Sequence, residues 1–381
     1  MAVNNEVKSN LLKMAKHHVL TKNFSLMGKK LSLTYYIVAC HEFEGKDADG
    51  GTDWFYVQQH GILNGAPDYR KYWANTRVKV NGESWYVGEG EVCLNYVDYY
   101  RMKNYLQSGD ASNDNAELIF VEPEAINNVT TYSVLESISI GGNAGFEAGD
   151  ENGGNGTFSV DSGFETAYSF EVQDCSCKGM SLGKNNSSAE WEYTFKRASQ
   201  NRAAGKWQRL HDPAVLSYSV FSPINTWIWK FPTKNRRQYD KFISEFELGI
   251  MNTISRYSGS QSPKDISKKA SEAERKTSFE IPLVMPPLLA VDKTNILFSE
   301  KKQTKKLYIA SQGEWDIEVK DSSTTWVSVD CDGGDGENCV VHVSVEEYTG
   351  DKIRQAFLQI NRKNSTEQIQ VKIVQSSGEI S

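Results

Sequence analysis

Apolar and polar residues alternate along two arms of one central stretch, Val134 to Val172. Successive side chains of a β-strand point to opposite faces, so a period of two indicates strands. A loop of glycine, asparagine and acid, residues 149–156, joins the arms, and the pattern therefore predicts one long β-hairpin. Its apolar face consists of Ile138, Ile140, Ala144, Phe146, Phe158, Val160, Phe164, Tyr168 and Phe170.

The length of each arm leaves two interpretations open. A transmembrane strand needs ~9–11 residues when it is tilted, and each arm can supply that many. Charge returns to the apolar face only near the ends, at Glu136 and Asp174. The hairpin is therefore either a membrane-inserting stem or a long hairpin of a sandwich with one face on the core and one in water.

Four short runs in and beyond this hairpin share their order with a known family. SISIGGN occupies residues 137–143, GGNGTFS 153–159, LSYSVFSP 216–223 and SEFEL 244–248. These runs resemble the leukocidin and haemolysin family of β-barrel pore-forming toxins, over roughly Tyr35 to Ile281. The resemblance implies a β-sandwich with a rim and a pre-stem hairpin. It also implies monomers that bind a target-cell membrane lipid or surface receptor, form a homo-oligomeric ring and insert stem residues 134–172.

The same resemblance implies a rim at about residues 190–215, where aromatic and basic side chains meet lipid head groups. The candidates in this stretch are Trp191, Arg197, Trp207 and Arg209. Tryptophan rings favour the membrane interface and arginine pairs with phosphate. The alternative is that both tryptophans are partly buried anchors of a loop.

Prolines at positions 282, 286 and 287 break the chain and predict two domains, 1–287 and 288–381. The second should contain seven short strands, at residues 295–299, 305–310, 315–319, 326–329, 340–345, 356–361 and 369–375. Its motifs around Trp315, Trp326 and the closing Val374-Gln375 resemble the BACON domain family. That resemblance implies an Ig-like β-sandwich on a secreted or cell-surface protein, with glycan or mucin as partner. The two tryptophans are expected in the core.

Composition narrows the class of partner and the location. The chain has 42 lysines and arginines against 49 acids, a net charge of −7, which argues against nucleic acid. No apolar run reaches ~18 residues, and the strand-like runs predict an all-β protein. The N-terminus has no apolar signal-peptide core, so an exported protein would have lost its signal from this sequence.

Candidate chemistry is sparse, and we expect no catalytic residue, cofactor or metal and no enzyme activity. Residues 179–183 match a Gly-x-Ser-x-Gly elbow, but loop-like residues follow where a helix is required. Residues 47–53 are calcium-like in composition but depart from the EF-hand order. Cys331 and Cys339 flank a short turn and should form a disulfide if the protein is exported.

Two functions compete at this point. The first is a secreted pore-forming toxin-like protein whose C-terminal module supplies adhesion. The alternative is a non-lytic surface protein that keeps the toxin fold and binds glycan or mucin. The thin apolar face at Gly142, Ala144 and Ala148 and the acidic tip at Asp150 and Glu151 favour the alternative.

Overall fold

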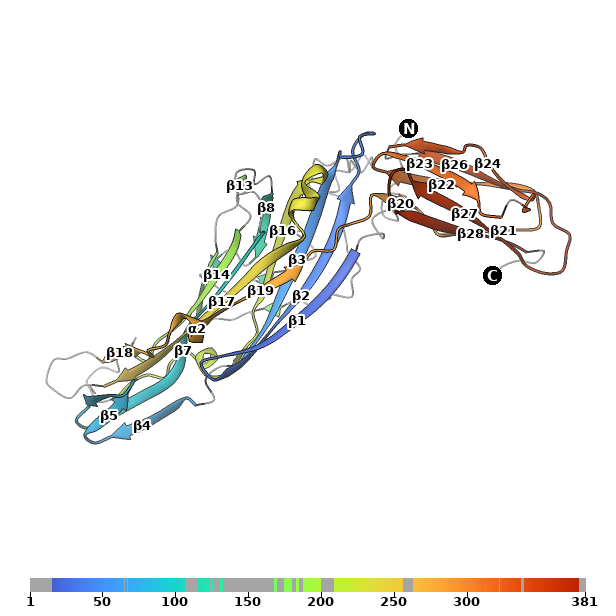
Figure 1. Ribbon diagram of the computed structural model, residues 1–381. Helices are drawn as coiled ribbons and strands as arrows, with labels where there is room; N and C mark the ends of the chain where they lie inside the picture. The colour runs from blue at the N-terminus through green and yellow to red at the C-terminus, as the bar shows by residue number, and fades with distance from the viewer. Residues whose placement is uncertain are drawn as a thin grey trace, which may run out of the picture.

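The fold is all-β, as the strand periodicity predicts, and it consists of two β-sandwiches in one elongated molecule (Figure 1). The structure is a computed structural model. It describes residues 16–64, 66, 68–106, 116–122, 125–126, 131–132, 168–169, 175–179, 183–184, 188–199, 209–255, 263–321, 323–336 and 339–376.

Two antiparallel sheets form the first sandwich. The seven-stranded sheet runs in the order β1 (Lys16–Leu26), β2 (Lys29–Glu42), β3 (Thr52–Asn64), β16 (Ile224–Pro232), β8 (Glu117–Glu122) and β13 (Gly183–Lys184), with β15 (Val220–Phe221) beside β3. The eight-stranded sheet runs in the order β18 (Lys264–Ser267), β17 (Lys241–Ile254), β7 (Gly90–Leu106), β14 (Ser188–Phe195), β12 (Cys175–Gly179) and β9 (Ala125–Ile126). There β19 (Lys276–Pro282) pairs with β17, and β4 (Arg70–Ala74) pairs with β7.

Small elements connect and extend these sheets. They are the hairpin β5 (Arg77–Val80) and β6 (Glu83–Tyr86), the ladder β10 (Thr131–Tyr132) with β11 (Tyr168–Ser169), the 3-10 helices η1 (Val215–Ser217) and η2 (Thr233–Gln238), and the helix α2 (Glu272–Arg275). Ser271 and Glu274 form a capping box at the start of α2. The capping box satisfies backbone donors that such a short helix would otherwise leave unpaired.

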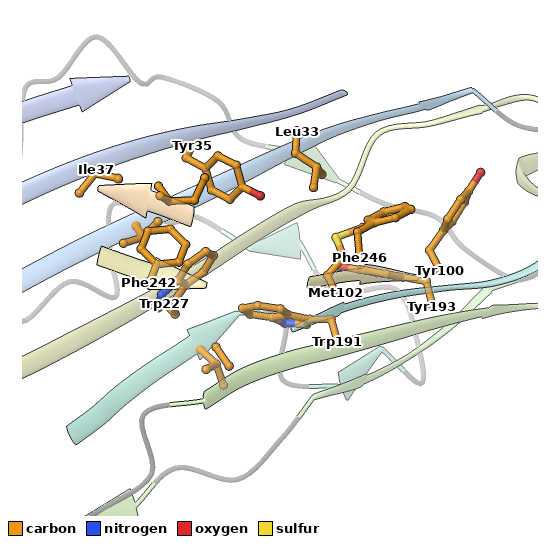
Figure 2. Packing of buried hydrophobic residues seen from close by; sticks show 14 of the residues in the cluster. Leu33, Tyr35, Ile37, Tyr100, Met102, Trp191, Tyr193, Trp227, Phe242 and Phe246 are labelled. Carbon is orange, nitrogen blue, oxygen red and sulfur yellow. The ribbon is translucent and has the colours of Figure 1, made fainter. Parts of the chain in front are cut away.

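Aromatic residues at alternate positions of the strands fill the core between the two sheets (Figure 2). Trp227 of β16 packs on Trp191 of β14, with ring centroids 5.5 Å apart, so the tryptophans join one sheet to the other. Phe242 of β17 lies against the Trp227 ring at 5.9 Å. Aromatic side chains bury ~150–250 Å² each, so this cluster contributes strongly to the sandwich's stability.

A fully buried polar network crosses the same core. The Tyr35 hydroxyl donates to Ser244 Oγ at 2.7 Å, and the Asn225 amide donates to Gln59 Oε1 at 2.9 Å. Gln59 in turn donates to Tyr35 Oη at 3.3 Å. Buried polar groups are costly unless they are paired. The network therefore favours the observed alignment of the two packed sheets over shifted alignments that would leave these groups unpaired.

The second sandwich contains all seven strands that the sequence predicts in this part of the chain. One sheet is β20 (Leu289–Val291), β22 (Gln303–Ser311), β26 (Cys339–Val345) and β24 (Val327–Val329). The other is β21 (Asn295–Phe298), β28 (Gln368–Gln375), β27 (Arg354–Arg362), β23 (Glu314–Val319) and β25 (Gly333–Asp335). Trp315 is 1% exposed inside this sandwich's own core, as expected, and Trp326 packs partly buried against it.

Candidate functional site

A short hairpin projects from the far end of the first sandwich, and a tight turn shapes it. Asn81 and Gly82 both have positive φ, 56° and 79°, as a two-residue type I′ turn requires. The turn is anchored, because Asn81 Nδ2 donates to the Ser267 carbonyl at 2.7 Å. Val78 and Val80 enter a small separate core, so the other face of β5 must point outward.

Aromatic rings are exposed around this hairpin. Tyr72 is 38% exposed, Trp73 45% and Tyr86 60%, and Trp85 beside them is half-buried. We call Tyr72, Trp73, Trp85 and Tyr86 the aromatic end. It lies at the end of the first sandwich opposite the second sandwich, near the labels β4 and β5 (Figure 1).

Cations accompany these rings. The Lys264 ammonium lies 3.9 Å from the centroid of the Trp85 ring, and the Arg70 guanidinium lies 5.7 Å from that of Tyr72. Arg77 pairs with Tyr86 across the β5–β6 hairpin, and Lys79 shares its exposed face. Amphipathic rings beside basic groups are the residue types that meet lipid head groups.

The predicted rim residues lie elsewhere, and for Trp191 the prediction is wrong. Trp191 is 0% exposed, and Figure 2 shows it in the core near Met102 and Tyr193. In β14 the alternate residues Ala189, Trp191, Tyr193 and Phe195 all face inward. Trp191 therefore holds the sandwich together and does not face lipid.

Arg197 is held by carboxylates. Its guanidinium donates to both oxygens of Asp98, at 2.7 and 3.0 Å, and lies 3.8 Å from Asp265. The hydrogen bond to Asp98 raises the pKa of Arg197. A phosphate would have to displace these acids, so the geometry gives Arg197 a structural role. Arg209 is exposed, and Trp207 lies outside the described residues.

The chain enters and leaves the predicted stem as a paired ribbon. Strand β8 pairs with β13 in one sheet, and β9 pairs with β12 in the other. Beyond the sandwich β10 pairs with β11, where Tyr132 lies opposite Tyr168 and Thr131 opposite Ser169. Apart from Tyr168, whose strand position is given, the predicted stem residues of the apolar face lie outside the described part of the chain.

The disulfide predicted between Cys331 and Cys339 is absent from the structure, where both are free thiols. Cys339 Sγ lies 2.9 Å from the Asp335 carbonyl oxygen, and both side chains pack against the second core. The pair thus contributes packing to the second sandwich in place of a covalent link.

The candidate chemical sites lack the structural context that their chemistry requires. Residues 183–184 form strand β13, where a nucleophile elbow needs a helix. Within the described residues no three histidine, cysteine or acidic side chains are grouped to hold a metal.

A cleft of about 470 Å³ in the second sandwich is lined by Glu314, Trp315, Asp316, Asp332, Asp335 and Lys363. No helix in the described ranges is long and apolar enough to cross a membrane.

Comparison with known proteins places pore-forming toxins among the similar structures. No family model and no curated protein matches the chain. NetB toxin of Clostridium perfringens in its membrane-inserted form is 11% identical to this chain. The match covers 70% of this chain and 95% of the NetB chain, with a TM-score of 0.35. Delta-toxin of the same species is 10% identical to this chain. The match covers 78% of this chain and 90% of the delta-toxin chain, with a TM-score of 0.34.

A glycosidase also matches a small part of the chain. A GH5 xyloglucanase of Bacteroides ovatus, solved with a XXXG heptasaccharide, is 22% identical over 24% of this chain and 20% of its own, with a TM-score of 0.22. At TM-scores below 0.5 none of these likenesses carries an argument about function. The functional case therefore depends on the residues described above.

Proposed function

We propose that this chain is a secreted, pore-forming toxin-like protein that docks on a target membrane through its aromatic end and inserts the 134–172 hairpin. Copies of the chain would each contribute one hairpin to a shared barrel, and the second sandwich would supply adhesion. We propose no enzymatic step. The all-β fold and the toxin-like resemblance of the stem motifs support this proposal.

The observation that carries it is the register of β10 and β11. Tyr132 lies opposite Tyr168, so even-numbered residues face even-numbered residues across the ribbon. Directly opposed residues of an antiparallel pair share a face. If the hairpin keeps this register, Ile140 lies opposite Val160 and the apolar sets of the two arms fall on the same face. A closed barrel needs this arrangement, with apolar residues toward lipid and polar ones toward water.

The aromatic end supports the docking step. Its rings are exposed on strands that a packed core holds rigidly, and Arg70, Arg77 and Lys79 form no ion pair with any residue the structure describes. Cations beside exposed rings can engage anionic and zwitterionic head groups without breaking an ion pair.

Dye leakage from liposomes and from vesicles of host-cell membrane tests the function. We expect the wild-type chain to release the dye and Phe164→Lys to block release, because a lysine on the lipid face is unfavourable, by up to the ~2–4 kcal/mol that applies at the bilayer midplane. Glu165→Lys is the matched control, since residue 165 belongs to the polar face. Binding to glycan or mucin with no leakage from any membrane would favour the non-lytic alternative.

A further inference from the structure

Gln312, in the turn between β22 and β23, extends from the second sandwich into a loop of the first. Its side chain is 0% exposed. Gln312 Nε2 donates to the carbonyl oxygens of Glu44, at 2.9 Å, and of Asp47, while Oε1 accepts from the Glu44 amide at 3.1 Å. Because these partners are backbone groups with one role each, they fix which end of the amide is the oxygen.

His41 lies between this amide and a buried acid. His41 Nε2 is 3.2 Å from Gln312 Oε1, and His41 Nδ1 is 2.9 Å from Asp53 Oδ1. Asp53 is 0% exposed and also accepts from Arg236, at 2.9 Å from Nε and 2.7 Å from Nη2. A carboxylate clamped by a guanidinium is ionised and only accepts.

Both ring nitrogens of His41 therefore face acceptors, and both contacts are hydrogen bonds only if both nitrogens donate. Only the imidazolium form of histidine carries two N–H groups. A neutral ring with its proton on Nε2 would turn a lone pair toward Asp53, with the Thr233 hydroxyl 3.4 Å away as a replacement donor. A neutral ring with its proton on Nδ1 would turn a lone pair toward Gln312. Either neutral form loses one of the two bonds.

The surroundings leave little room for another arrangement. A Cβ at Gly50 would lie 2.8 Å from Gln312 Nε2, and one at Gly51, where φ is +77°, would lie 2.8 Å from His41 Cε1. The Phe43 ring packs edge-on against the imidazole at 4.6 Å. The titratable and charged groups around the joint include Asp53, Arg236, Glu42, Cys40, Asp49 and Arg362, and Lys46 forms an ion pair with Asp335 across the joint at 2.8 Å.

The same groups hold the connection between the sandwiches. Arg236 Nη2 also donates to the Pro286 carbonyl at 3.3 Å, and Arg362 donates to the Gln312 carbonyl at 2.6 Å. The Leu288 amide donates to the Glu367 carboxylate at 3.1 Å. Loss of the Gln312 contact would therefore weaken the cluster that connects linker, loop and both sandwiches here, beside the Lys46–Asp335 ion pair.

We propose that His41 is a proton-dependent latch between the two sandwiches. In its charged form it bridges Asp53 of the first sandwich and Gln312 of the second. In its neutral form it releases one of them, and the joint loosens. The stabilisation is present while His41 carries both ring protons and is lost when a rise in pH removes one of them. An acidic medium would hold the second sandwich more firmly, and a more alkaline one would loosen the joint.

Hydrogen exchange of the full chain, corrected for intrinsic rates, tests the latch at about pH 5.5 and about pH 8.5. We expect the amides of residues 43–51 and 283–289 to exchange about tenfold faster at the higher pH, as the loss of one charged hydrogen bond implies. The midpoint should coincide with the titration of His41 followed by ¹⁵N-histidine NMR, with both ring nitrogens protonated at the acidic end.

Variants separate the latch from general pH effects. His41→Gln and Gln312→Ala should each remove the pH response of both segments. His342→Gln is the matched control, because His342 bonds to Asp330 at 2.7 Å on the second sandwich and outside the joint. The latch is refuted if protection does not change with pH in the wild type, if the response survives in His41→Gln, or if His41 carries one ring proton at the acidic end.

Discussion

Replacing Trp191 by alanine separates a core role from a membrane role, and Trp73→Ala is its matched partner. The Trp191 side chain is fully buried, whereas Trp73 is 45% exposed. An indole that buries ~150–250 Å² contributes about 4–6 kcal/mol at ~25 cal/mol per Å², an upper limit because the unfolded chain also buries surface. Measured tryptophan-to-alanine costs in cores are about 3–5 kcal/mol.

We therefore expect Trp191→Ala to lower the urea midpoint of unfolding by the equivalent of about 3–5 kcal/mol. Trp73→Ala should change stability by less than about 1 kcal/mol, as exposed substitutions usually do. Binding to vesicles should behave the other way: Trp73→Ala weakens it severalfold, while folded Trp191→Ala binds as the wild type does. Urea unfolding followed by circular dichroism, and vesicle co-sedimentation, give the two readouts. Unchanged stability of Trp191→Ala together with lost vesicle binding would refute the core assignment.

Two further expectations concern buried polar groups. Arg197→Ala should lower the free energy of unfolding by about 1–3 kcal/mol, because it leaves the buried Asp98 carboxylate without its guanidinium. Vesicle binding should be unchanged. Weaker binding at unchanged stability would instead support the rim role of Arg197. Burial raises the pKa of Tyr35 to about 12, so the folded phenol keeps its proton at a pH where an unfolded one loses it near ~10. The free energy of unfolding should therefore fall as the pH rises from ~10 to ~12, and it should fall less in Tyr35→Phe. Denaturant unfolding measures this free energy, and phenolate absorbance follows the ionisation. An equal dependence on pH in the two proteins would contradict the prediction.

Local pattern predicts the strands well where they are long enough to alternate. The seven strands of the second sandwich are all present, because each carries several alternating or apolar residues. The extra strands β20 and β25 are three residues each, and Gly333-Gly334-Asp335 has the composition of a turn. Such strands exist only because a neighbouring strand offers hydrogen bonds, and a single sequence does not display that neighbour.

The rim shows how a resemblance can override a correct local signal. Trp191, Tyr193 and Phe195 alternate with Glu190, Glu192 and Thr194, which is the period of a half-buried strand. The resemblance placed Trp191 at the lipid surface, and the structure follows the alternation instead. For the aromatic end, the Asn81-Gly82 turn is readable from sequence. Nothing in the sequence separates the exposed Trp73 from a core tryptophan, because its exposure depends on strands that approach from elsewhere.

The joint between the sandwiches could not be predicted at all. His41 and Gln312 are 271 positions apart, and neither belongs to a motif. Their contact follows from the path of the linker and from a glycine loop that closes on the amide. Only tertiary structure reveals that both imidazole nitrogens face acceptors.

An environment-sensitive dye on single cysteines through the stem tests the central claim most directly. If the stem keeps the β10–β11 register, even positions share one face, and the proposed barrel turns Phe146, Phe164 and Phe170 toward lipid and odd positions such as Glu147 and Glu165 toward the lumen. The account predicts that adding target membranes moves the dye at even positions into hydrocarbon while the dye at odd positions stays in water. Signals that remain unmoved at every position on membranes that bind the protein would contradict the proposed pore-forming function.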